Sequence, residues 1–254
     1  RALAAYERTL GKDHADTLMS VNNLANLLWR QGKLDEAKPM FERALAARER
    51  TLGKDHADTL GSVNNLAVLL SDQGKLDEAK PMYERALAAK ERTLGKDHAS
   101  TLTSVNNLAA LLYQQGKLDE AKPMYERALA AYERTLGKDH ADTLRSVNNL
   151  AALLYQQGKL DEAKPMYERA LAAYERTLGK DHADTLMSVN NLANLLWRQG
   201  KLDEAKPMFE RALAARERTL GKDHADTLGS VNNLAVLLSD QGKLDEAKPM
   251  YERA

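Results

Sequence analysis

The sequence repeats itself every 42 residues from one end to the other. The segment RALAAYERTLGKDHADTL begins at Arg1 and recurs almost unchanged at Arg43, Arg85, Arg127, Arg169 and Arg211. Residues 1–86 are also identical to residues 169–254, so only four of the six repeats are distinct. Recent gene duplication and deliberate construction would both produce such identity. Units of this size bury a core by stacking, so each repeat is expected to contact mainly its neighbours.

Each repeat is predicted to contain two helices. Helix A is expected from about Ala15 to Gln31, with Asp13 as its N-cap. Helix B is expected from about Asp35 to Leu52, with Asp35 as its N-cap and Gly53 in the left-handed conformation at its end. The short turn between the two helices makes them an antiparallel hairpin.

Both helices are amphipathic at about 100° per residue. The apolar face of helix A comprises Thr17, Leu18, Val21, Leu24, Ala25 and Leu28. The apolar face of helix B comprises Ala37, Met40, Phe41, Ala44, Leu45 and Leu52. Because one hairpin cannot bury both faces, we expect an all-α solenoid in which stacked hairpins share a continuous core.

Composition restricts the function. The chain has 37 lysines and arginines against 37 aspartates and glutamates, so no net charge attracts nucleic acid or an anionic membrane. No apolar run approaches the roughly 18 residues of a membrane helix. The absence of cysteine excludes disulfides and thiolate metal sites. We therefore expect neither a nucleic-acid nor a membrane partner, and a cytoplasmic location is favoured because no signal peptide is visible either.

The sequence offers no constellation for catalysis. One histidine recurs in each repeat, at His14, His56, His98, His140, His182 and His224. Equivalent positions of stacked repeats lie too far apart to share a metal ion, whose ligand bonds are about 2 Å long. We expect these histidines to be loop or cap residues. The prediction is a protein that is not an enzyme, with no catalytic residue, no metal and no cofactor.

The pattern of each repeat resembles that of the tetratricopeptide repeat family. The residues that carry the resemblance are Leu24, Ala25, Gly32, Ala37, Phe41 and Ala44. The unit of 42 residues exceeds the usual length of about 34. The longer unit, with NNLA, QGK, EAKPMYERAL and LGKDH, is similar to the repeats of kinesin light chains.

This resemblance implies a right-handed α-solenoid, or superhelix, of stacked antiparallel helix hairpins. Residues 1–254 would form a single array, with truncated B helices at about residues 1–10 and 244–254. The A helices would line a concave groove that holds a peptide segment of a partner protein. In such grooves asparagines of helix A bond the backbone of the ligand.

Variation between the repeats is confined to seven of the 42 columns, a column being one set of equivalent positions. The columns are those of Tyr6, Asp16, Met19, Asn26, Trp29, Arg30 and Phe41. Four of them lie with Ala15 and Asn22 in one sector of about 100° on helix A. Under the resemblance this sector is the groove, so the variable positions are expected to read the side chains of a ligand.

The candidate peptide-binding residues form two sets. The fixed set, whose amides can match a peptide backbone, comprises Asn22, Asn64, Asn106, Asn148, Asn190 and Asn232. The variable set comprises Met19, Asn26, Trp29, Arg30, Asp72, Thr103, Tyr113, Gln114, Arg145, Tyr155, Gln156, Asn194, Trp197 and Arg198. A ladder of asparagines between adjacent A helices is the structural alternative for the first set, and packing on the next A helix is the alternative for the tyrosines.

Two further alternatives concern the whole pattern. Exposed positions can drift because nothing holds them, but six polar columns that look exposed never change: Glu7, Arg8, Lys33, Lys38, Glu42 and Arg43. The second alternative is a structural scaffold that associates head to tail through uncapped repeats. The leading prediction is a non-catalytic module that binds a protein or peptide partner.

Overall fold

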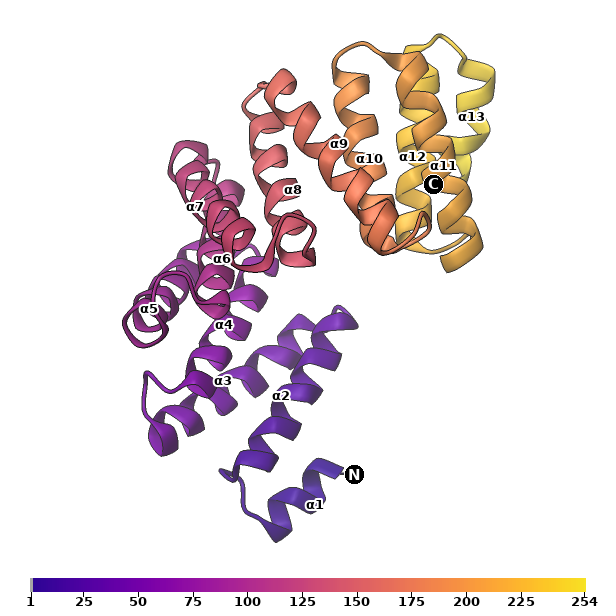
Figure 1. Cartoon of the computed structure of the whole chain (residues 1–254). Helices are drawn as coiled ribbons and strands as arrows, with labels where there is room; N and C mark the ends of the chain where they lie inside the picture. The colour runs from indigo at the N-terminus through magenta and orange to yellow at the C-terminus, as the bar shows by residue number, and fades with distance from the viewer. Residues whose placement is uncertain (1) are drawn as a thin grey trace. The chain divides into compact units, whose positions relative to one another are not determined.

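The computed structural model describes residues 2–254, and the described part of the chain is helical throughout (Figure 1). Its helices fall into two compact units, which meet between Ala131 and Tyr132 within one helix. The helices are α1 (Ala2–Thr9), α2 (Ala15–Arg30), α3 (Leu34–Leu52), α4 (Ala57–Asp72), α5 (Leu76–Leu94), α6 (Ala99–Gln114), α7 (Leu118–Leu136), α8 (Ala141–Gln156), α9 (Leu160–Thr177), α10 (Ala183–Arg198), α11 (Leu202–Leu220), α12 (Ala225–Asp240) and α13 (Leu244–Arg253).

Within each unit, consecutive helices pack as hairpins. In the first unit α2 packs against α3, α3 against α4, α4 against α5 and α5 against α6. In the second unit the same succession runs from α8 to α13. The even-numbered helices are the predicted A helices, and the odd-numbered ones are the B helices. The predicted all-α architecture of stacked helix hairpins is therefore confirmed, whereas a single array over the whole chain stays a prediction.

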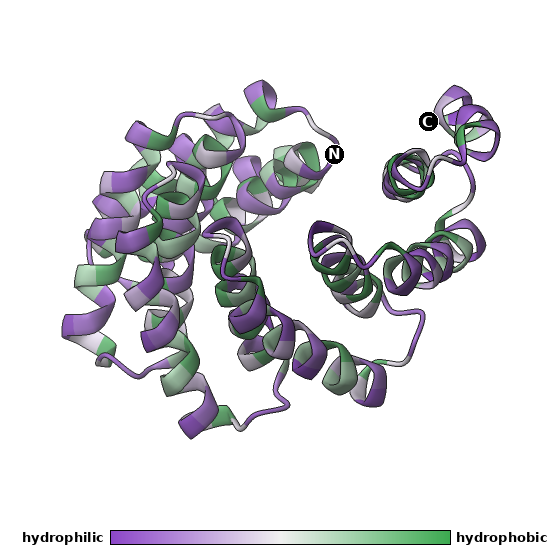
Figure 2. Cartoon of the chain, turned by 90° about the horizontal axis from the view of Figure 1, so that it is seen from above, coloured by the Kyte–Doolittle hydropathy of each residue, from purple (hydrophilic) through white to green (hydrophobic). Residues whose placement is uncertain are grey.

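The core lies between hairpins, and the hydropathy colouring shows apolar and polar residues alternating along the helices (Figure 2). Leu18, Val21 and Ala25 are buried as expected. Leu52 was expected in the core but is 43% exposed, because helix B ends there and its side chain is left at the surface. Leu69, in a column not assigned to the core, is fully buried.

The A helices begin at a histidine cap. The Nδ1 atom of His56 accepts a hydrogen bond from the backbone amide of Asp58 at 3.2 Å, and the same bond recurs at His98 and His140. Such a bond satisfies one of the amides that the first turn of a helix leaves unpaired. The prediction of a cap role for the histidines is confirmed. The prediction of Asp13 as the cap was wrong, because its carboxylate pairs with Arg50.

The B helices begin differently from the prediction. Helix α3 starts at Leu34, with Lys33 as its N-cap and no side-chain capping bond. Asp35 does not cap, because its Oδ1 accepts a hydrogen bond from Nε2 of Gln73 in the next repeat at 3.1 Å. The helix ends at Gly53 with φ +89° and ψ 164°, which is a positive φ but not the expected left-handed helical conformation.

We predict opposite stability effects for alanine at two glycines of the second repeat. Gly53→Ala should lower the free energy of unfolding by about 1–3 kcal/mol, because side chains rarely adopt its backbone conformation. Gly61→Ala should raise it by up to about 1 kcal/mol, because Gly61 is helical and an added Cβ meets no atom within 4 Å. Urea unfolding of both variants measures the difference, and equal shifts would contradict this account.

Candidate functional site

The variable columns of helix A lie at the surface in every repeat. No member of the Met19, Asn26, Trp29 or Arg30 columns is buried. The Arg30 column is exposed throughout, and the Trp29 and Asn26 columns are half-buried. The sequence therefore located an accessible face of the A helices correctly, although accessibility alone does not make it a binding site.

Two of these columns bond to each other across adjacent A helices. Nε1 of Trp29 on α2 donates a hydrogen bond to Oδ2 of Asp72 on α4 at 2.6 Å. Trp197 on α10 donates the same bond to Asp240 on α12 at 2.7 Å. These polar groups, which were expected to face a ligand, are engaged within the stack.

A different pair occupies the same two columns between α8 and α10. The guanidinium of Arg198 lies 4.7 Å from the centre of the Tyr155 ring, a cation–π distance. Its Nη1 also donates a hydrogen bond to the backbone carbonyl of Tyr155 at 2.7 Å. Packing on the next A helix, the alternative raised for the tyrosines, is thus realised at Tyr155.

The fixed asparagines are largely part of the stack as well. Nδ2 of Asn107 donates to Oδ1 of Asn64 at 2.7 Å, and equivalent bonds join Asn65 to Asn22 and Asn233 to Asn190. These bonds form the asparagine ladder that was raised as the structural alternative.

Two members of the fixed column are almost inaccessible. Asn106 and Asn148 are each 4% exposed, and Nδ2 of Asn148 donates to the hydroxyl of Ser188 on the next A helix at 3.1 Å. They present no amide edge to solvent, so we leave them out of the binding surface proposed below. Asn232, in the last A helix, is exposed.

Sequence reasoning overlooked the second asparagine of each pair. Asn23 is exposed, and its equivalents Asn65, Asn107, Asn149 and Asn191 are half-buried. On a helical wheel Asn23 lies about 20° from Arg30, on the accessible side of the sector. Asn65, Asn107 and Asn233 of this column are the donors of the asparagine ladder, so the column takes part in the stack as the Asn22 column does.

The Met19 and Asn26 columns complete the accessible face. Met19 is 54% exposed and Met187 is 41% exposed. The side chains of Asn26 and Asn194 form no hydrogen bond with any other described residue. These two columns therefore include partly or fully exposed side chains that form no hydrogen bond with another described residue.

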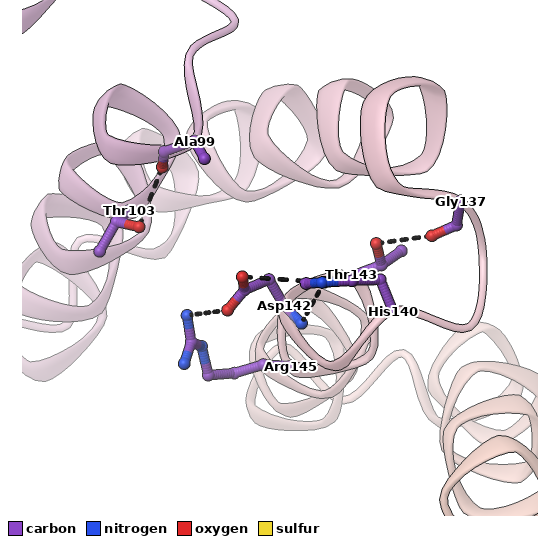
Figure 3. A network of polar contacts seen from close by, with 7 residues as sticks. All are labelled: Ala99, Thr103, Gly137, His140, Asp142, Thr143 and Arg145. Atoms are coloured by element: carbon purple, nitrogen blue, oxygen red, sulfur yellow. Dashed lines mark hydrogen bonds and ion pairs between the residues drawn. The ribbon is translucent and has the colours of Figure 1, made fainter. Parts of the chain in front are cut away.

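Polar members of the Met19 column bond within their own helix (Figure 3). Arg145 pairs with Asp142 at 2.7 Å, one turn earlier in α8, close to the His140 cap. In the first unit the hydroxyl of Thr103 donates to the carbonyl of Ala99 at 3.0 Å. Gln114 and Gln156, in the Arg30 column, are exposed at the ends of α6 and α8.

A pocket adjoins the Met19 column in each unit. In the first unit it measures about 450 Å³ and is lined by Met19, Leu18, Arg48 and Asp58 among others. In the second unit the equivalent pocket measures about 390 Å³ and is lined by Met187, Leu186, Arg216 and Asp226 among others. Both pockets lie where the start of an A helix meets the end of the following B helix.

The residue in the Tyr6 column forms part of the wall of this pocket. Arg216 lines the pocket below Met187, whereas Tyr174, at the equivalent position one repeat earlier, is 3% exposed. Burial raises the pKa of the Tyr174 hydroxyl, and the nearby Asp184 acts in the same direction. This variable column therefore lies beside a pocket, a position that the sequence alone did not indicate.

The polar columns that never change have structural partners. Arg43 of α3 pairs with Glu7 of α1 at 2.7 Å, and Arg85 pairs with Glu49 in the same way one repeat later. Arg92 pairs with Asp55 at 2.6 Å, the counterpart of the Arg50–Asp13 pair. These columns are therefore invariant because their side chains bond to neighbouring repeats. Their invariance is no argument against random drift at exposed positions that have no such partners.

No group of metal-ligating side chains gathers in residues 2–254. None of the helices described here has the length and apolarity that crossing a bilayer requires.

The sequence model of the tetratricopeptide repeat family matches residues 1–50, 19–92, 58–134, 100–176, 139–217 and 184–254. The chain belongs to the tetratricopeptide repeat family. Proteins with these repeats generally serve as non-catalytic scaffolds for protein interactions. No curated protein matches the sequence.

Solved structures support the resemblance to kinesin light chains. A putative kinesin light chain with nearly identical TPR-like repeats from Podosopora anserina is 29% identical, with a TM-score of 0.66 over 82% of this chain and 98% of that one. BtubC (BKLC) from P. vanneervenii is 26% identical, with a TM-score of 0.72 over 87% of this chain and 89% of that one. The apo form of RapI, at 12% identity and a TM-score of 0.66 over 93% and 95%, shares the fold alone.

The buried tyrosines beside the accessible face predict that the free energy of unfolding decreases at alkaline pH. Burial raises the pKa of Tyr83 to about 12. In the unfolded chain a tyrosine ionises near pH 10. Between these values the unfolded state releases a proton that the folded state keeps, so stability falls as pH rises.

We therefore expect Tyr83→Phe to weaken this loss, by at most about 1.4 kcal/mol per pH unit above pH 10. Urea midpoints at pH 8 and pH 11 measure it. The pH 8 value isolates the effect of removing the hydroxyl itself. A variant whose midpoint falls as steeply as that of the parent chain would rule out the contribution of Tyr83.

Proposed function

We propose that this protein is a non-catalytic interaction module that binds a peptide segment of a partner protein on the accessible face of its A helices. The observation that carries the proposal is the coincidence of variation with accessibility. The Met19 and Asn26 columns change between repeats, are never buried, and include side chains free of bonds within the described chain. Surface residues that vary between otherwise identical repeats, and that bond to no other residue, are available to contact a ligand and to distinguish between ligands.

In the second unit the proposed site is built from three neighbouring A helices, α8, α10 and α12. In the second unit Met187 and Asn194 of α10 form its centre, with Arg145 on α8 and Val236 on α12 on either side. Arginine and large apolar side chains supply much of the binding energy at protein interfaces. Gly229 on α12 leaves open space in which a ligand backbone could approach closely.

The pocket below Met187 would hold an anchoring side chain of the peptide. Leu186 and Leu220 provide apolar lining, while Asp184 and Asp226 place carboxylates at the wall. An anchor with an apolar stem and a basic end, such as lysine or arginine, fits this chemistry. In the first unit the same residues line the equivalent pocket beside Met19, and no described A helix precedes α2 there to supply a counterpart of Arg145.

The test begins with a peptide selected from a displayed random library on the full chain. Because both units carry the methionine and the pocket, both methionines must be changed together. We expect Met19→Ala with Met187→Ala to weaken peptide binding about tenfold or more, a loss of about 1.4 kcal/mol or more. Fluorescence anisotropy with the labelled peptide measures the affinity, and light scattering in the same buffer reports whether the array self-associates.

Two further variants sharpen the test. Arg48→Tyr with Arg216→Tyr places in both pockets the residue that is buried at position 174, so it should close the anchor site while preserving the fold. Glu162→Ala on α9, exposed on a B helix, is the control that should leave binding unchanged. The proposal fails if the methionine pair binds like the parent chain, or if the control loses as much affinity.

A further inference from the structure

The cross-helix bonds described above give the Trp29 and Arg30 columns a second role. We propose that these columns form a neighbour-recognition pair, in which the side chain of one repeat selects the side chain of the next and so specifies the order of repeats. The partner that this edge of an A helix fits is an adjacent A helix with the matching residue. The inference does not depend on peptide binding.

The first pair type is an indole donor with a carboxylate acceptor. Trp29 and Asp72 lie 43 positions apart and meet at 2.6 Å. Trp197 and Asp240 repeat the pair at 2.7 Å, as the identity of residues 1–86 with 169–254 requires. A charged acceptor makes the bond stronger than one between neutral groups.

The second pair type uses different chemistry at the same positions. Where the Trp29 column carries Tyr155, the next repeat carries Arg198 instead of an aspartate. A tyrosine ring offers a cation its electron-rich face, and the guanidinium lies over that face. An aspartate in place of Arg198 would meet the negative face of the Tyr155 ring, which has no N–H group to donate. An arginine in place of Asp240 would leave the indole N–H of Trp197 without its acceptor.

A third variable column, that of Phe41, changes together with the Trp29 column of the same repeat. Repeats with tryptophan at this position have phenylalanine at position 41 or 209, which has no hydroxyl to satisfy. Repeats with serine have tyrosine, and Oγ of Ser239 donates to Oη of Tyr251 at 3.4 Å. A hydrogen bond with Ser71 also acts on the pKa of the equivalent Tyr83. The variable residues thus change in matched sets.

A separate line of contacts joins the B helices α3 and α5 to the A helices that follow them. Nη1 of Arg48 donates to Oγ of Ser62 at 2.7 Å and to the carbonyl of Asp58. Nζ of Lys90, which is 8% exposed, donates to Oγ of Ser104 at 2.9 Å and to the carbonyl of Ser100. Ser100 is also the single departure from aspartate in its column, so a second variable pair differs together at this junction.

The test is a double-mutant cycle with a partner swap, carried out in the full chain. Trp197→Phe and Asp240→Asn should each speed hydrogen exchange of α12 amides about fivefold, and together they should have no more effect than either alone. Asp240→Arg alone should speed exchange at least as much. Trp197→Tyr added to Asp240→Arg recreates the Tyr155–Arg198 pair and should restore slow exchange.

The control cycle combines Asn194→Ala with Val236→Ala, from a variable column without a cross-helix hydrogen bond. These two changes should act independently. The proposal is overturned if the Trp197 and Asp240 effects simply add, or if the tyrosine–arginine combination exchanges as fast as Asp240→Arg alone. If Trp197→Tyr restores slow exchange to the Asp240→Arg variant, the result supports recognition between the two positions. A role of Asp240 in local packing alone predicts that a change at position 197 has no such effect.

Discussion

The structure depends on bonds between each repeat and the next, because no hairpin encloses its own core. The same polar contacts recur at fixed separations along the chain: Arg43 with Glu7, Gln73 with Asp35, and Asn65 with Asn22. Each surface ion pair is worth little alone. Repeated along the stack, beside buried leucines and alanines, these contacts fix how one hairpin lies on its neighbour. The stability of a repeat is therefore set mainly by what it packs against.

This dependence on neighbours divides the variable positions into two groups. Side chains at the Trp29 and Arg30 columns reach the adjacent A helix and are engaged there in three observed pairs. Side chains at the Met19 and Asn26 columns point to the accessible face and leave surface for a ligand. Variability on its own cannot separate these groups, since both vary and neither is buried. The distinction comes from distances between helices.

The sequence was sufficient for the fold and for locating an accessible face of the A helices. A 42-residue period and two amphipathic faces predict stacked hairpins, and recurring glycines predict where the helices end. The caps were wrong at Asp13 and Asp35 because their carboxylates bond to residues about 37 positions away, which local patterns do not report. For the same reason the sequence left two roles open for the Asn22 column, a peptide contact and a ladder between A helices. Asn22 and Asn23 are neighbours in sequence, and only the register between A helices decides which one is covered.

Near-identity of the repeats creates a problem of register that only the variable columns can solve. Thirty-five of the 42 columns are the same in every repeat, so the contacts they form are equally good between any two hairpins. Near-identical segments are prone to misassembly and domain swapping for this reason. Any preference of a repeat for one successor over another must therefore come from the remaining seven columns. Trp29 opposite Asp72, and Tyr155 opposite Arg198, place complementary chemistry at those columns, where a wrong neighbour would break the bond.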